Sequence, residues 1–146
     1  MDLLESIRNS FSDSYEEARN RFLNAAKAKQ IDIQSYINPN IGSLKEQLSC
    51  DTAWMGPRNA KKVLVIISGT HGVEGFCGSG CQIDWMSSTN VKDLPIDVAL
   101  LFIHAINPFG FSWCRRVTEE GCDLNRNYLV FSKPLPQNEG HEDLVD

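Results

Sequence analysis

The sequence predicts an α/β fold, a three-layer sandwich in which helices cover a mixed, partly parallel sheet. Two unbroken apolar runs, residues 63–67 and 98–106, have the length and β-branched content of strands buried on both faces. The segment between them, residues 75–88, carries apolar and small residues at helical spacing. A strand, a helix and a second strand in this order are expected to form a right-handed parallel unit.

The composition is typical of a globular protein that acts away from membranes and nucleic acids. The chain of 146 residues is 42% hydrophobic and 23% charged, which suffices for one domain with a core. Its net charge is −5 and its basic residues are scattered, which argues against a nucleic-acid partner. No apolar run is long enough to span a membrane and no signal-peptide pattern is present, so we expect a cytoplasmic protein. The five cysteines lack scaffold spacing, which favours reduced thiols.

The N-terminal part is expected to supply a helix and an antiparallel pair of strands. Ser14, followed three residues later by a glutamate, has the form of a capping box, and residues 15–29 then show an apolar stripe at helical spacing. Residues 31–37 alternate apolar and polar side chains, which is typical of a strand and suggests one at an edge of the sheet. A turn at residues 38–42 leads to a second strand at 44–54, antiparallel to the first.

The turn after the first apolar run carries the strongest candidate for a chemical site. Its sequence SGTHGVEG places His71 and Glu74 at the carboxyl end of a strand, where ligands bind in open α/β sheets. Glycines beside both residues remove bulk, so the imidazole and the carboxylate can turn toward one zinc ion. The alternative is a turn in which the two side chains hydrogen-bond to each other and to the backbone. A phosphate-binding loop fits less well, because Glu74 would repel phosphate and no lysine follows.

Two further segments carry candidate functional groups. The second apolar run ends in a turn at residues 107–111, and the segment that follows, residues 113–128, is polar and bears several arginines. Within the helix at 75–88, Cys77 and Cys81 are four residues apart, a spacing that could serve a metal pair. We expect them instead to be buried free thiols that face the sheet.

These motifs, in this order, resemble those of the zinc metallocarboxypeptidases of the M14 superfamily. The chain has HGVEG after one apolar strand, INPFGF after the next, and then GCDLNRNY. The family has His-x-x-Glu, Asn-Pro-x-Gly and Gly-x-Asp-x-Asn-Arg-Asn at the corresponding places. The segment SGTHGVEGFCGSGCQ is most similar to the bacterial DUF2817 branch. The resemblance covers residues 11–131 and implies the N-terminal part of a carboxypeptidase-like fold.

The resemblance implies a role for each matching residue. His71 and Glu74 match the first two zinc ligands. Arg116 matches the arginine that polarises the scissile carbonyl and stabilises the oxyanion. Asn125 and Arg126 match the pair that holds the carboxylate of the substrate, for which the planar guanidinium fork is well suited.

The same segment offers further candidates and an alternative. Arg115, beside Arg116, is a less favoured candidate for binding substrate. Asp123 is expected to orient His71 or Arg126, because ligating histidines usually donate to such a partner. The alternative for the arginines is a structural salt-bridge network with the neighbouring acids.

Two parts of the family's catalytic site have no counterpart in this chain. A catalytic zinc needs a third protein ligand, which the family supplies as a histidine well downstream, followed by a general-base glutamate. His104 is expected to be a packing residue inside its strand, and His141 lies in an acidic tail. We expect residues 1–132 to form a partial carboxypeptidase-like domain and 133–146 to form that tail, flexible in solution.

The function implied by the resemblance is zinc-dependent hydrolysis of an amide bond in a peptide or a small acylated amino acid. Two alternatives stay open. The chain is the N-terminal part of a deacylase of small N-acyl amino acids, or it is an inactive remnant that binds metal weakly or serves as an interaction module. The late strands of the family's sheet are absent, so self-association through an uncovered sheet edge is a further expectation.

Overall fold

The computed structural model describes residues 3–130 and 132–134. In chain order the elements are α1 (Leu3–Arg8), α2 (Tyr15–Ala28), β1 (Asp32–Ile41), β2 (Gln47–Met55), β3 (Lys62–Ile67), α3 (Glu74–Ser88), the 3-10 turn η1 (Val91–Asp93), β4 (Val98–His104) and α4 (Pro108–Ser112). Helix α2 begins at the predicted cap, because the Ser14 hydroxyl accepts a hydrogen bond from the Glu17 N–H at 3.2 Å. Both predicted long helices are therefore confirmed.

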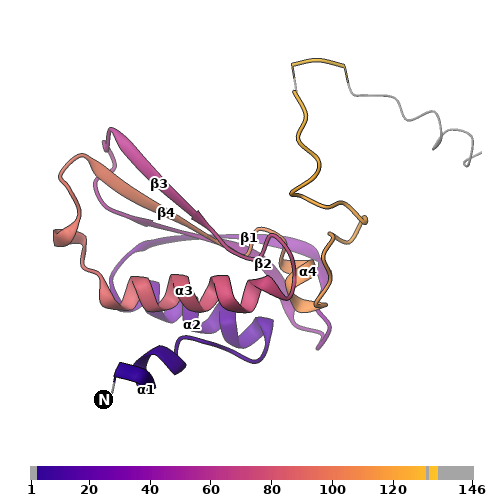
Figure 1. The fold of residues 1–146 in the computed structure, drawn as a ribbon, viewed down its shortest axis with the longest axis horizontal. Coiled ribbons are helices and arrows are strands. Elements are labelled where there is room, and N and C mark those ends of the chain that lie inside the picture. The colour runs from indigo at the N-terminus through magenta and orange to yellow at the C-terminus, as the bar shows by residue number, and fades with distance from the viewer. Residues whose placement is uncertain (1–2, 131, 135–146) are drawn as a thin grey trace, which may run out of the picture.

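The four strands form one sheet in the order β1-β2-β4-β3 (Figure 1). Strand β2 is antiparallel to both β1 and β4, whereas β3 and β4 are parallel. The α/β class, the mixed sheet and the parallel unit across α3 are thereby confirmed. Because β3 and β4 are adjacent and parallel, the turns that follow them lie at the same end of the sheet.

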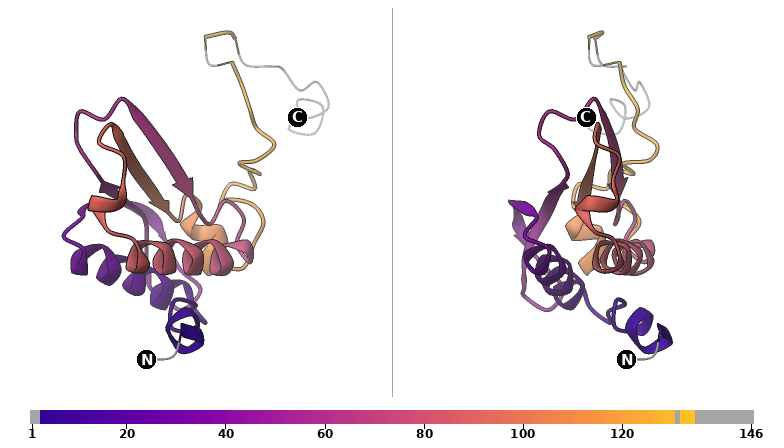
Figure 2. Two further views of the ribbon diagram at one scale, coloured as in Figure 1. Left: turned by 60° about the vertical axis from the view of Figure 1, so that its left-hand side comes forward. Right: turned by 90° about the vertical axis from the view of Figure 1, so that its left-hand side faces the viewer.

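Both long helices pack on one face of this sheet and against each other (Figures 1 and 2). The core between them consists of buried side chains from both helices and from the central strands, among them Phe22, Met55, Ile83 and Phe102. No helix from the described residues covers the opposite face. The second helical layer of the predicted three-layer sandwich is therefore not among the elements that the structure describes.

Strand β3 corrects one prediction, since it is an edge strand and is not buried on both faces. Ile66 packs against the core, but Val63, Val65 and Ile67 point to the open face and are 43%, 45% and 49% exposed. The apolar run correctly predicted a strand. The run could not show that β3 has a neighbouring strand on only one side. Nor could it show that, within the described part of the chain, helices cover only one face of the sheet.

Smaller corrections concern the N-terminal third and helix α3. Strand β1 continues to Ile41, through the predicted turn at 38–42, and the hairpin turns at Gly42 instead, whose N–H donates to the Glu46 carbonyl. Helix α1 was not predicted. Cys77 and Cys81 are exposed, so the expectation of buried thiols facing the sheet is wrong.

Candidate functional site

The chain leaves the sheet after β3 through a glycine that the local geometry requires. The Ser68 N–H still donates to the Ile103 carbonyl at 3.0 Å, so pairing with β4 continues one residue beyond the strand. Gly69 then adopts a φ of +67°, in the left-handed region that favours glycine. A Cβ at this position would also lie 2.7 Å from the Cβ of Ala105. The turn that carries His71 is therefore fixed from its first residues.

A second close approach joins this turn to the arginine-bearing segment. The Gly72 N–H donates to the Arg115 carbonyl at 2.9 Å, and the Arg115 N–H donates to the Gly110 carbonyl at 2.8 Å. A Cβ on Gly72 would lie 2.1 Å from the Gly110 oxygen and 2.6 Å from the Arg115 nitrogen. Only glycine allows the two backbones to come this close, and their contact holds residues 113–123 beside His71.

Asn107, of the Asn-Pro motif, links the turns that follow the two parallel strands. Its side chain is 2% exposed. The side-chain oxygen accepts from the Gly110 N–H at 2.8 Å and caps helix α4, while the side-chain amide donates to the Thr70 carbonyl at 3.3 Å. The Asn-Pro motif therefore links the turn before His71 to the start of helix α4.

Both ring nitrogens of His71 face carboxylates. Nδ1 lies 3.1 Å from Oε2 of Glu74, and Nε2 lies 3.0 Å from Oδ1 of Asp123. His71 is only 7% exposed, whereas the side chain of Glu74 is 71% exposed. The imidazole is thus held in place by the protein, and the carboxylate of Glu74 borders solvent.

The partners of Asp123 determine which nitrogen of His71 carries its proton. The Asp123 carboxylate also accepts from Arg116 Nε at 2.8 Å and from the Asn125 N–H at 2.9 Å. The hydrogen bond from His71, followed by those from Arg116 and Asn125, lowers the pKa of Asp123 to about 2. An ionised carboxylate can only accept, so the proton between it and His71 belongs to Nε2.

In the neutral tautomer with its proton on Nε2, Nδ1 of His71 would present a lone pair to the carboxylate of Glu74. Two acceptors 3.1 Å apart repel each other unless a second proton or a cation lies between them. Two ligands about 2.1 Å from a tetrahedral zinc ion would be about 3.4 Å apart, close to the separation seen here. The separation of 3.1 Å is also that of a hydrogen bond between the two side chains, the alternative stated for this turn. The pair could hold two positions of a zinc site, with Asp123 beside the other ring nitrogen.

The described residues supply no complete zinc site. No three histidine, cysteine, aspartate or glutamate side chains among them lie together as a ligand set. His104 is fully buried, with Nε2 2.8 Å from the Ser79 hydroxyl and its ring stacked on Phe22 at 4.6 Å. Its expected place in the core is confirmed. His141 lies outside the described residues.

The predicted substrate-binding residues are brought together only in part. Arg116 joins the cluster through Asp123, and no described residue pairs with its two terminal nitrogens. The Asn125 side chain accepts from the exposed Tyr128 hydroxyl at 2.8 Å. Arg126 is exposed and donates to the carbonyl of Asn125.

Arg115 is placed differently from its neighbour. Its guanidinium lies over the Phe109 ring, 5.9 Å from the centroid, while its backbone fastens the loop to Gly72. The role of Arg115 toward substrate stays a prediction. Of the alternative salt-bridge network, one ion pair is present, between Arg116 and Asp123, whereas the side chain of Glu119 accepts from Asn38 and Asn40.

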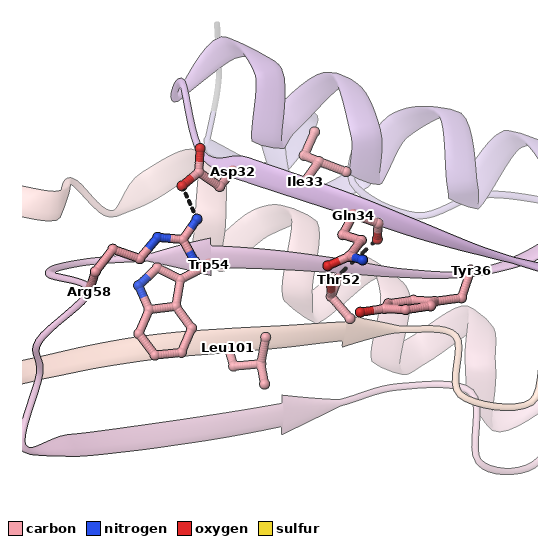
Figure 3. Close-up of a pocket in the computed structure, with 8 residues that line it drawn as sticks. All are labelled: Asp32, Ile33, Gln34, Tyr36, Thr52, Trp54, Arg58 and Leu101. Carbon is pink, nitrogen blue, oxygen red and sulfur yellow. Dashed lines mark hydrogen bonds and ion pairs between the residues drawn. The ribbon is translucent and has the colours of Figure 1, made fainter.

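A separate hollow lies on the open face of the sheet and includes none of the predicted site residues. Figure 3 shows the residues that line it, which come from β1, β2, β4 and the loop after β2: Asp32, Ile33, Gln34, Tyr36, Thr52, Trp54, Arg58 and Leu101. Arg58 pairs with Asp32 and lies over the Trp54 ring, 5.7 Å from its centroid. The two charged side chains of the hollow, Asp32 and Arg58, therefore pair with each other.

The family of the chain follows from a comparison of its sequence with family profiles. The family described as "Protein of unknown function (DUF2817)" matches residues 11–146, which includes the His71 turn, the Asn107 turn and the Asp123 segment. The chain belongs to the DUF2817 family. No curated protein matches its sequence.

Solved structures similar to this DUF2817 chain include bacterial glutaminyl cyclases. The enzyme of Fimbriiglobus ruber matches with 10% identity and a TM-score of 0.44, over 60% of this chain and 36% of that one. An enzyme of Porphyromonas gingivalis matches with 12% identity and a TM-score of 0.39, over 70% of this chain and 48% of that one. This chain thus spans less than half the length of these structures. Within the described residues, no helix has the length and hydropathy to cross a membrane.

Sequence reasoning missed the residues that support the site. Gly72 and Asn107 were not singled out, although both lie in the motifs that were. The signal for Asn107 was present, because an asparagine followed by proline and then glycine at the third position is typical of a capped helix start. No such signal was present for Gly72, because its close approach is to the backbone of Gly110 and Arg115, more than 30 residues away along the chain.

Proposed function

We propose that this chain carries part of a zinc-dependent amide hydrolase site of the carboxypeptidase-like M14 type. The observation that carries the proposal is the distance of 3.1 Å between Nδ1 of His71 and Oε2 of Glu74, on an imidazole whose Nε2 lies 3.0 Å from Asp123. Ligating histidines characteristically have such a carboxylate partner. His71 and Glu74 would hold the ion, and the resemblance to the M14 peptidases names the same pair.

The residues of this chain would do three things around a bound substrate. Asp123 keeps the Nε2 proton of His71 in place, so that Nδ1 stays a ligand. The terminal nitrogens of Arg116 are available to the oxygen of a scissile carbonyl as negative charge develops on it. Asn125 and Arg126 would bind the terminal carboxylate of the substrate. When bound, zinc supplies Lewis-acid polarisation of the carbonyl and activation of water.

The substrate class within this proposal is an amide whose amine part is an amino acid that carries a free carboxylate. A peptide with a free C-terminus and a small N-acyl amino acid both meet that description. The third ligand and the general base would come from outside the described residues. A complete active site therefore needs more than the elements described above.

Hydrolysis of two substrate sets tests the proposal. Purified protein is incubated with zinc and with either N-acetyl amino acids or dipeptides, and the released amino acid is measured. Zinc binding is measured alongside, and we expect it to be lost in His71→Ala and retained in Arg58→Ala, whose ion pair lies on the open sheet face. Any turnover should be lost in both His71→Ala and Arg116→Ala. Turnover that survives His71→Ala, or the absence of turnover together with absent zinc binding, would contradict the proposal.

A second candidate function is that of an interaction module, which the exposed edge strand favours. The outer edge of β3 has no partner strand among the described residues, and its side chains on the open face are apolar. Exposed edges of this kind pair with other strands. If a second copy pairs here, sedimentation will show a dimer, and Val65→Lys will shift it to a monomer. A wild-type protein that stays monomeric at high concentration would exclude this candidate.

A further inference from the structure

Helix α3 carries two thiols on its outer surface, one helical turn apart. Cys77 and Cys81 are both exposed, and all five cysteines of the chain are free. The inward side of the helix is lined by buried residues, among them Gly75, Ser79 and Ile83. A Cβ on Gly75 would lie 2.7 Å from the Phe111 ring, so this side lies close to its neighbours and the thiol side is turned outward.

The two thiols influence each other. Partial burial and the neighbouring Cys77 thiol raise the pKa of Cys81, and Asp84 on the next turn adds to this effect. Two thiolates and a carboxylate on one helix face repel each other when ionised. A cation that binds both sulfur atoms would relieve that repulsion.

The helix geometry favours a bridging ion over a disulfide. Residues four apart on a regular helix have Cβ atoms about 5–6 Å apart, whereas a disulfide needs a separation of about 3.5–4.5 Å. Oxidation to a disulfide would therefore distort α3. One metal ion with two bonds to sulfur of about 2.3 Å can span sulfur atoms up to about 4.6 Å apart, which two cysteine side chains on adjacent turns can reach without distortion.

We propose that Cys77 and Cys81 form a surface site that binds one thiophilic metal ion of the Cu(I) type. Soft thiolate ligands select such ions, and Cu(I) accepts two ligands in a linear arrangement. That coordination number suits this site, because no third ligating side chain completes a cluster among the described residues. Binding replaces the two thiol protons with one Cu(I) ion and leaves the oxidation states of copper and sulfur unchanged.

This site is separate from the His71 site in its ligands and in its chemistry. Glu74 precedes Cys77 by one helical turn, but a carboxylate is a poor ligand for a soft ion. The ring nitrogens of His71 are directed at Glu74 and Asp123. Substitution of His71 should therefore leave Cu(I) binding unchanged, which distinguishes failure of this proposal from failure of the zinc proposal.

Competition for Cu(I) tests the proposal. Reduced protein is titrated into Cu(I) held by the chelator bicinchoninate, and transfer of the ion is followed by the colour of the chelator complex. We expect one Cu(I) per chain to transfer to wild type, His71→Ala and Cys114→Ser, and transfer to be lost in Cys77→Ser and in Cys81→Ser. Cys114 is the matched control because it is also exposed.

Alkylation provides a second readout that does not depend on affinity. With Cu(I) added, iodoacetamide should fail to label Cys77 and Cys81, while Cys114 stays reactive. Transfer that survives Cys81→Ser, or protection of only one of the two thiols, would overturn the proposal. So would loss of transfer in Cys114→Ser.

Discussion

The two histidines in the described part of the chain lie at the same end of the sheet and have opposite environments. His104 is the last residue of β4, and His71 follows the end of the parallel strand β3. His104 is enclosed between Phe22 and Ser79, and its Nδ1 has no partner. Burial lowers its pKa to about 4. His71 has a carboxylate at each nitrogen.

The comparison shows that the groups around a histidine ring determine whether the ring serves as a core residue or as a candidate ligand. At His104 burial disfavours the charged form, so the ring stays neutral and acts as a flat core residue that is hydrogen-bonded to Ser79. At His71 one carboxylate, that of Asp123, lies at Nε2 and a second, that of Glu74, lies at Nδ1. The first arrangement stabilises the fold, and we propose that the second holds a cation. The following experiments try to separate these two roles.

Truncating each histidine should produce the largest contrast. His104→Ala removes a buried ring and leaves Ser79 without its partner, so we expect the free energy of unfolding to fall by about 3 kcal/mol. His71→Ala should lower it by roughly 1–2 kcal/mol, because one hydrogen bond to a charged group is lost. Urea unfolding measures both. Zinc binding should show the reverse pattern, lost in His71→Ala and kept in folded His104→Ala. If the two variants lose stability equally and zinc affinity equally, the proposed difference in role between the two histidines is wrong.

Removing the charge behind His71 should weaken zinc binding without removing a ligand. In Asp123→Asn the partner of Nε2 is neutral and no longer fixes the tautomer, so zinc affinity should fall by about 10–100-fold. Isothermal titration measures the change. The matched control is Glu119→Gln, whose side chain contacts Asn38 and Asn40 and not His71. An unchanged affinity in Asp123→Asn would mean that Asp123 does not support the site.

The dependence of stability on pH should report on His104. Its pKa is about 4 in the folded protein and about 6.5 when unfolded, so the unfolded chain binds the additional proton between these values. Stability is therefore full above pH 6.5, falls as the pH drops toward 4, and is constant below that for this group. Between pH 7 and pH 5 the loss should be roughly 2 kcal/mol.

A variant isolates this contribution from that of the other titrating groups. Asp51 and Arg19 also act on His104, in opposite directions, and both remain in His104→Gln. We expect the variant to lose roughly 2 kcal/mol less than wild type between pH 7 and pH 5 in urea unfolding. Parallel losses in the two proteins would show that His104 does not stay neutral when folded.

Local patterns predicted the elements well because local physics determines them. The cap at Ser14, the apolar runs of β3 and β4, and the order of the motifs all gave correct elements. The exposure of Val65 and of Cys77 could not be predicted in the same way. The sequence of an apolar strand does not show whether other strands and helices of the same chain cover both of its faces. The sequence of a helix with both small and large apolar residues does not show which side of the helix packs against the rest of the protein. In α3 the small residues pack inward, which turned the cysteines outward.

The candidate site, too, was predictable where it depends on local sequence and unpredictable where it depends on distant contacts. His71 and Glu74 were found because three residues of sequence place them together, and Asp123 was expected as a support on chemical grounds. That Asp123 meets Nε2 and leaves Nδ1 to Glu74 depends on the backbone contact between Gly72 and Arg115. No local pattern contains that contact. The roles of Arg116, Asn125 and Arg126 toward substrate stay predictions.

The protonation of His71 tests the central claim most directly. Nitrogen-15 NMR of the labelled imidazole at pH 7.5 reports both ring nitrogens, with His71→Ala used to assign the signals. We predict that added zinc leaves the proton on Nε2 in place and produces a large shift of Nδ1 alone. A ring protonated on both nitrogens, and unchanged by zinc, would show that His71 forms an ion pair with Glu74 and Asp123 and holds no metal.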